Sequence, residues 1–197
     1  MNMWEIEQEY TQKGYRLICG ADEAGAGPLA GAVYAAAVIL PLGLEIEGLD
    51  DSKRVTEKKR DELFDIIREK AVAWEVRWID AEEIDETNIL AARLKAMDLC
   101  IEALQPKPDF ALIDGNRDKG IRCPHATVVH GDGLSANIAA ASILAKVSRD
   151  RYMVEMDGLY PQYGFARHKG YPTKAHYEAL RKYGPCPIHR KTFLKKL

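Results

Sequence analysis

The chain has few cysteines and no closely spaced pair of them. Cys19, Cys100, Cys123 and Cys186 lie far apart in the sequence, and no CxxC motif occurs. Structural zinc sites and disulfide frameworks depend on such spacings, so neither is expected here. The four thiols are predicted to stay reduced, as thiols do in the cytoplasm.

Long hydrophobic runs are also missing. No apolar segment approaches the roughly 20 residues that a membrane-spanning helix needs. Residues 1–9 are polar and acidic, unlike an export signal with its basic start and apolar centre. These absences predict a cytoplasmic protein that does not act at a membrane.

A strong excess of one charge is absent as well, because the formal net charge is only −2. The charges are unevenly distributed, however. Residues 45–102 hold many of the acids, whereas Glu178 is the single acid among many Lys and Arg residues in 167–197. This basic stretch could contact a phosphate backbone, or it could be the solvated face of a helix.

The composition, 47% hydrophobic and 29% charged over 197 residues, is sufficient for one sizeable core. Apolar runs rich in β-branched residues predict strands, and apolar residues at helical spacing predict helices. Strands are expected at 16–22, 32–40, 74–79, 110–113 and 127–129, and helices at 56–70, 87–104, 134–156 and 173–183. This order predicts an α/β fold with a central mixed sheet, flanking helices and a small C-terminal helical part.

The most informative segment begins with the adjacent acids Asp22 and Glu23, at the end of an apolar run. A loop with glycines at positions 25, 27 and 31 follows directly. Paired acids at a strand end suit a metal site, and glycines let a backbone approach a ligand closely. The segment therefore indicates metal-assisted chemistry on a ligand held against main chain, such as a sugar-phosphate.

Two further apolar strands are followed by acids, Asp114 and Asp132. Each Asp-Gly pair alone could simply form a turn or a helix cap. If the strand ends converge on one edge of the sheet, four like charges would gather there and repel one another. Divalent metal resolves that conflict, and oxygen-only ligands suit Mg²⁺ or Mn²⁺ rather than zinc. Two such ions are a common arrangement for phosphodiester hydrolysis.

Several motifs together resemble those of ribonuclease HII, the type 2 ribonuclease H family. They cover nearly the whole chain in order and read DEAGAGPLAG from Asp22, LDDSK from Leu49, LIDGN from Leu112, HGDGLSANIAAASILAKVSRD from His130, and YGFARHKGYPT from Tyr163. The resemblance implies an RNase H-like fold with a five-stranded mixed sheet. It divides the chain into a catalytic domain, 1–157, and a basic helical segment, 158–197, that helps to bind substrate.

The resemblance also implies an activity. The family hydrolyses the RNA strand of RNA/DNA hybrids and nicks DNA duplexes 5′ to an embedded ribonucleotide, leaving a 3′-hydroxyl. Asp22, Glu23, Asp114 and Asp132 resemble its catalytic metal carboxylates. Tyr171 resembles the tyrosine that stacks on the neighbouring deoxyribose. The Gly25–Gly27 loop resembles the segment whose backbone reads the ribose 2′-hydroxyl, the group that distinguishes RNA from DNA.

Four other residues are candidates for substrate contact. Ser52 and Lys53 lie in a polar loop and are expected near the scissile phosphate. Lys146 and Arg149 are three positions apart on one helix face, so they could face phosphate, hold the carboxylates, or form a solvated pair. His168, His176 and His189 have no metal-ligand spacing and are expected at phosphate or at the surface.

The loop departs from the family at one position. It normally reads Gly-Arg-Gly, and this chain has Ala26 between the glycines. Alanine lacks the five-donor guanidinium that suits phosphate. We therefore expect either a natural or an introduced loop variant with weakened activity or altered preference.

Alternative functions are a hybrid-binding protein with little catalysis and another two-metal nuclease of the same fold. The expected partner is nucleic acid, and a monomer is the default. The segment Lys191-Thr192-Phe193-Leu194 is too short and generic to identify a sliding-clamp peptide.

Overall fold

The computed structural model describes residues 2–195 and contains one five-stranded sheet in the order β3-β2-β1-β4-β5. Its strands are β1 (Ile18–Ala24), β2 (Val33–Ile39), β3 (Ala73–Ile79), β4 (Phe110–Asp114) and β5 (His125–Val128). Strands β1, β2 and β3 pair antiparallel, whereas β4 runs parallel to both β1 and β5. The predicted five-stranded mixed sheet is confirmed.

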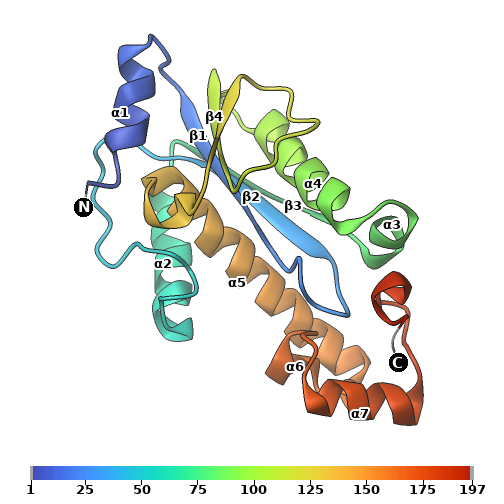
Figure 1. The fold of residues 1–197 in the computed structure, drawn as a ribbon. Coiled ribbons are helices and arrows are strands. Elements are labelled where there is room, and N and C mark those ends of the chain that lie inside the picture. Colours follow the sequence, from blue (N-terminus) through green and yellow to red (C-terminus); the bar gives the residue numbers. More distant parts are fainter. Residues whose placement is uncertain (1, 196–197) are drawn as a thin grey trace.

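Helices cover both faces of this sheet (Figure 1). The α-helices of residues 2–195 are α1 (Glu5–Gln12), α2 (Glu57–Lys70), α3 (Ala81–Glu86), α4 (Ile89–Ala103), α5 (Ala136–Leu159), α6 (Phe165–His168) and α7 (Lys174–Tyr183), of which α6 and α7 lie beyond the sheet at the end of α5. The sequence analysis did not predict α1, α3 or α6, because each is too short to show a clear apolar period. The expected division at 157/158 falls inside the last turn of α5.

Helix α5 lies very close to β1, together with α2 on the same face. A Cβ atom at Gly20 would lie 2.3 Å from the backbone of Asn137, so only glycine fits at this crossing. The side chain of Asn137 ties the layers together, since it donates to Ile18 O and accepts from Leu40 N–H. The fully buried Ala139, Ala140 and Ala141 continue this tight packing.

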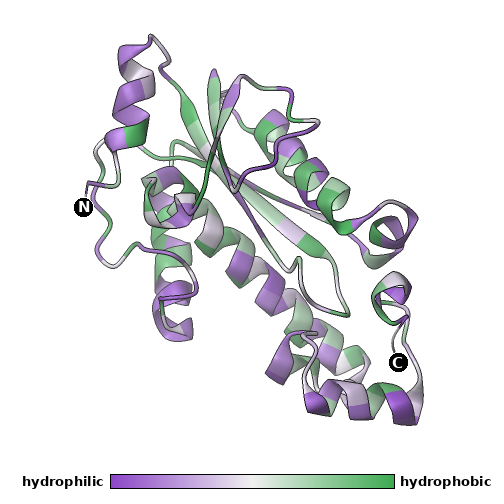
Figure 2. Ribbon diagram, in the orientation of Figure 1, coloured by the Kyte–Doolittle hydropathy of each residue, from purple (hydrophilic) through white to green (hydrophobic). Residues whose placement is uncertain are grey.

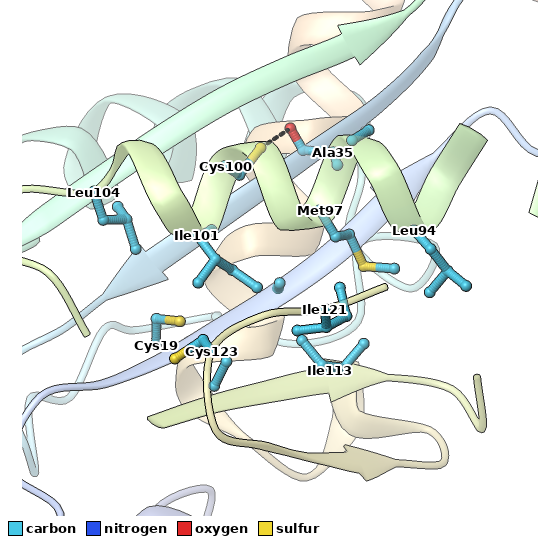
Figure 3. Close-up of a cluster of buried hydrophobic side chains, with 14 of the residues drawn as sticks. Cys19, Ala35, Leu94, Met97, Cys100, Ile101, Leu104, Ile113, Ile121 and Cys123 are labelled. Atoms are coloured by element: carbon cyan, nitrogen blue, oxygen red, sulfur yellow. Dashed lines mark hydrogen bonds between the residues drawn. The ribbon is translucent and has the colours of Figure 1, made fainter. Parts of the chain in front are cut away.

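Helix α4 covers the opposite face through a core of aliphatic and sulfur-containing side chains (Figure 3). Met97 lies above Ile121 and Ile113 in this view, Ile101 lies above Cys123, and Cys100 Sγ donates to the carbonyl of Ala35. All four cysteines are free thiols. Hydrophobic residues gather along the strands and α4, while α1 is largely hydrophilic (Figure 2).

The parallel pairing brings the carboxyl ends of β1, β4 and β5 to one edge of the sheet. The far end of α5 carries α6 and α7 near this edge, and the chain then returns toward α3 (Figure 1). Within residues 2–195, no helix has the length and hydrophobicity to cross a bilayer.

Candidate active site

Four acidic side chains meet at the carboxyl edge of the sheet. Asp22 and Glu23 lie within β1, and Asp114 is the last residue of β4. Strand β1 begins and ends two residues later than predicted, because its pairing with β2 continues to Ala24. Asp132 lies in the 3-10 turn Gly131–Gly133 that follows β5, rather than at a strand end.

A backbone contact holds this turn beside β4. The N–H of Gly131 donates to Asp114 Oδ1 at 2.7 Å. A Cβ at Gly131 would come within 2.5 Å of the Ile138 side chain, so the turn also packs tightly against α5. Asp132 is consequently brought toward the other acids.

The acids interact strongly with one another. Burial raises the pKa of Asp22 well above its usual range, and the charges of Glu23 and Asp114 raise it further. Burial also raises the pKa of Glu23 and of Asp132, and Asp114 contributes in both cases. Proximity of the four carboxylates, inferred from the sequence, is thus present in the fold.

Each carboxylate nevertheless has its own protein partner. Asp22 Oδ1 accepts from the N–H of Glu23 at 2.7 Å. Glu23 Oε1 pairs with Arg93 Nη1 at 2.7 Å, and Asp132 Oδ2 lies 3.5 Å from Lys53 Nζ. In the described part of the chain, no three acidic, His or Cys side chains form a ready set of metal ligands.

A cleft of about 390 Å³ opens beside the acids. Every residue that the sequence analysis proposed for the site lines it, except Asp132. The lining residues are Asp22, Glu23, Ala24, Gly25, Ala26, Gly27, Ser52, Lys53, Asp114, Lys146, Arg149 and Tyr171. Segments distant in sequence therefore share one concave surface.

Packing requires glycine at position 25 of the loop but not at position 27. Gly25 has φ +95°, and a Cβ there would lie 2.0 Å from Arg149 Nε, so the fold itself demands glycine. At Gly27 a Cβ would meet only Tyr171, at an ordinary contact distance of 3.7 Å. Nothing in the protein requires glycine at position 27, which leaves open space on the cleft side.

The remaining predicted residues differ in their exposure. Tyr171 is 41% exposed and lies beside Gly27. Ser52 is buried, whereas the Lys53 side chain is 81% exposed. Lys146 Nζ pairs with Asp150 Oδ1 at 2.7 Å, on its own helix.

Arg149 is buried and donates to three backbone carbonyls, those of Ala30, Ala32 and Lys169, each at 3.1 Å. These contacts join the end of the loop to α5 and to the residue before Gly170. The sequence analysis did not predict that Arg149 binds backbone carbonyls, because residue spacing does not indicate which carbonyls a side chain contacts.

Two arginines at the site were missed. Arg93, on α4, holds Glu23, and Arg190 hydrogen-bonds to the carbonyls of Gly25 and Ala26. Arg93 lies 70 positions from Glu23 and Arg190 lies 165 from Gly25. No local sequence signal could have paired residues so far apart.

A mixed sheet of this order, with an acidic cluster at the carboxyl edge and a glycine loop beside it, defines an RNase H-like nuclease. The model of the family described as Ribonuclease HII matches residues 19–196. The chain belongs to the ribonuclease HII family, and it is an endonuclease that hydrolyses RNA in RNA/DNA hybrids.

Individual relatives agree with this assignment. A Ribonuclease HII of Acetivibrio thermocellus is 54% identical over 195 residues, 99% of this chain and 76% of the relative. Ribonuclease H2 from Pyrococcus horikoshii OT3 superposes with TM-score 0.74 at 26% identity, covering 90% of this chain and 93% of the other. RNase HII of Archaeoglobus fulgidus, solved in complex with PCNA, superposes with TM-score 0.73 at 25% identity. The match covers 89% of this chain and 94% of the other.

Proposed function

We propose that this ribonuclease H also nicks DNA duplexes 5′ to a single embedded ribonucleotide and leaves a 3′-hydroxyl, by two-metal-ion hydrolysis. The observation that carries the proposal is the shared cleft. Its acids Asp22, Glu23 and Asp114 line the same cleft as Gly27. A Cβ atom at position 27 would clash with no protein atom, so packing does not require glycine there. Such a surface suits a phosphodiester beside a ribose.

The acidic residues fit divalent metal. Burial and mutual repulsion raise the pKa values of Asp22, Glu23 and Asp132, so the charged cluster lacks a sufficient counter-charge. Asp22, Glu23, Asp114 and Asp132 would hold Mg²⁺ or Mn²⁺, both of which take oxygen ligands. When bound, such ions supply an activated water and stabilise the leaving 3′ oxygen.

The other cleft residues position the substrate. The N–H groups of the Gly25–Gly27 loop bind the ribose 2′-hydroxyl, which can both donate and accept. The exposed ring of Tyr171 stacks on the next deoxyribose, since it stands directly beside Gly27. Lys53 and Ser52 contact the backbone near the scissile phosphate, and Lys146, which pairs with Asp150, lines the same wall.

The direct test measures cleavage of a DNA duplex with one ribonucleotide, in Mg²⁺ or Mn²⁺, beside an all-DNA duplex of the same sequence. We expect one nick 5′ to the ribonucleotide and none in the control. Asp22→Asn and Asp114→Asn should abolish the nick, because each removes a metal-binding charge.

The alternatives correspond to other outcomes of the same experiment. Cleavage of the all-DNA duplex would indicate a different two-metal nuclease of this fold. Tight binding of the ribonucleotide duplex without metal-dependent cleavage would indicate a binding protein, with Ala26 as the cause.

A further inference from the structure

Two adjacent buried residues, His189 and Arg190, connect the C-terminal segment to both sides of the proposed ribose site. Their backbone forms a short bridge with the end of the glycine loop. The N–H of Gly31 donates to Ile188 O at 2.8 Å, and the N–H of Arg190 donates to Leu29 O at 2.9 Å. Both side chains are almost fully buried, so neither can touch substrate directly.

The guanidinium of Arg190 is centred under the loop. It donates to four carbonyls, those of Gly25 at 2.6 Å, Ala26 at 3.1 Å, Pro28 at 2.9 Å and Gly31 at 3.0 Å. A planar guanidinium offers its N–H donors in fixed directions. These contacts therefore fix the directions of the loop carbonyls as well as their distance from Arg190.

Those contacts also determine where the loop's donors point. In a planar trans peptide, the N–H lies opposite the carbonyl of the preceding residue. Because the carbonyls of Gly25 and Ala26 turn inward to Arg190, the N–H groups of Ala26 and Gly27 turn outward, away from it. These are the donors that the proposed function assigns to the ribose 2′-hydroxyl.

His189 reaches the other side of the site through a second histidine. The N–H of Cys186 donates to His189 Nδ1 at 2.9 Å, and we assign the proton of His189 to Nε2 on this basis. His189 Nε2 donates this proton to His176 Nε2, and the two nitrogens lie 3.0 Å apart. His176 then donates from Nδ1 to the carbonyl of Tyr171, also at 3.0 Å. The backbone position of Tyr171 therefore depends on His189.

We propose that His189 and Arg190 are positioning residues for ribonucleotide recognition, holding Tyr171 and the outward N–H groups of the loop in register with each other. The inference rests on the proposed function, because it assigns a supporting layer to that function's recognition site. A ribonucleotide fits only when the Tyr171 ring and the loop N–H donors are correctly spaced. A misplacement of about 1 Å can lower a reaction rate about 100-fold.

The test measures equilibrium affinity without catalysis, in EDTA, for a duplex with one ribonucleotide and for the same all-DNA duplex. We expect Arg190→Lys and His189→Leu to lower the ratio of the two affinities by roughly 10-fold, the effect of weakening the hydrogen bonds to the 2′-hydroxyl. His189→Gln should keep most of the ratio, because its amide can still donate toward His176. Asn137→Ala, a buried hydrogen-bonding residue at the other end of α5, is the control for lost stability alone.

Each result is read together with a melting curve. The proposal is overturned if Arg190→Lys and His189→Leu keep the wild-type ratio, or if Asn137→Ala lowers the ratio equally. If Arg190→Lys does not fold, the proposal is tested by comparing the affinity ratios of His189→Leu and His189→Gln. The proposed function fails in a different way, when the wild-type protein itself neither prefers nor cleaves the ribonucleotide duplex.

Discussion

Arg93 Nη1 lies 2.7 Å from Glu23 Oε1, so that α4 contributes a positive charge to an acidic cluster built on the sheet. The pair is largely shielded from water, with the Glu23 side chain 12% exposed. Burial is the largest influence on the pKa of Glu23 and raises it, while Arg93 opposes this most strongly. Arg93 thus keeps one carboxylate of the cluster more readily ionised.

Replacing Arg93 should therefore change the pH dependence of cleavage. In Arg93→Gln, Glu23 should hold its proton to higher pH, and the acidic limb of the kcat/KM profile should move to higher pH. Arg93→Lys, which retains the charge, should leave the limb near its wild-type position. Identical acidic limbs in the wild type and the Gln variant would contradict this role.

Asp22 should destabilise the metal-free fold at neutral pH. Between the ordinary carboxyl pKa and the raised pKa, the native state keeps a proton that the unfolded state has released. The free energy of unfolding consequently falls as pH rises through this window. Asp22→Asn removes the charge and keeps the acceptor for the Glu23 N–H.

We expect Asp22→Asn to raise the Tm of the protein in EDTA at pH 8, because the variant buries no charge at this position. The gain should shrink at pH 5, because the raised pKa favours the protonated wild-type carboxyl as the pH falls. Thermal melts of both proteins at the two pH values test this, and a variant less stable than wild type at pH 8 would refute it.

The two loop glycines should respond oppositely to alanine. Gly25→Ala places a Cβ against Arg149 at a positive φ, so we expect a loss of about 2–4 kcal/mol in stability. Gly27→Ala should change stability by less than about 1 kcal/mol and still lower ribonucleotide-dependent cleavage at least about 10-fold, because the methyl occupies the space proposed for the ribose. Full activity in Gly27→Ala would argue against that placement.

Introducing an arginine at position 26 should raise activity. A charge-assisted contact to phosphate is worth about 1.5–3 kcal/mol, so Ala26→Arg should increase the cleavage rate by roughly 10- to 150-fold. Ala26→Gln, which adds length without charge, is the matched control. If the arginine variant cleaves no faster than wild type, the loop is not impaired by its alanine.

The buried histidines should destabilise the protein in acid. Burial lowers the pKa of His176, and burial together with His176 lowers that of His189 to about 4. The two histidines contribute fully to the free energy of unfolding above pH 6.5. This contribution is lost as the pH falls toward 4, because the unfolded state binds protons at a higher pH than the native state does. Wild type should therefore lose about 2 kcal/mol more than His189→Gln between pH 7 and pH 4.5, measured by urea unfolding.

The sequence by itself determined the fold class and the order of the five strands and of helices α2, α4, α5 and α7. The helix predicted to begin at residue 56 does begin there, with the Thr56 side chain as its N-cap accepting from the N–H of Lys59. Caps, apolar periods and acids near strand ends are local patterns, and local backbone preferences suffice to read them. The motif series identified the family for the same reason, because each motif is contiguous.

Only the tertiary structure decided what surrounds those motifs. Asp132 reaches the cluster through a turn held by Asp114, and Glu23 is held by an arginine on a different layer. Arg149 and Arg190 both bury their charge beneath the loop by donating to carbonyls. Such contacts join residues that are tens to more than a hundred positions apart. Backbone carbonyls exist at every residue, so a sequence pattern carries no sign of which ones a buried guanidinium selects.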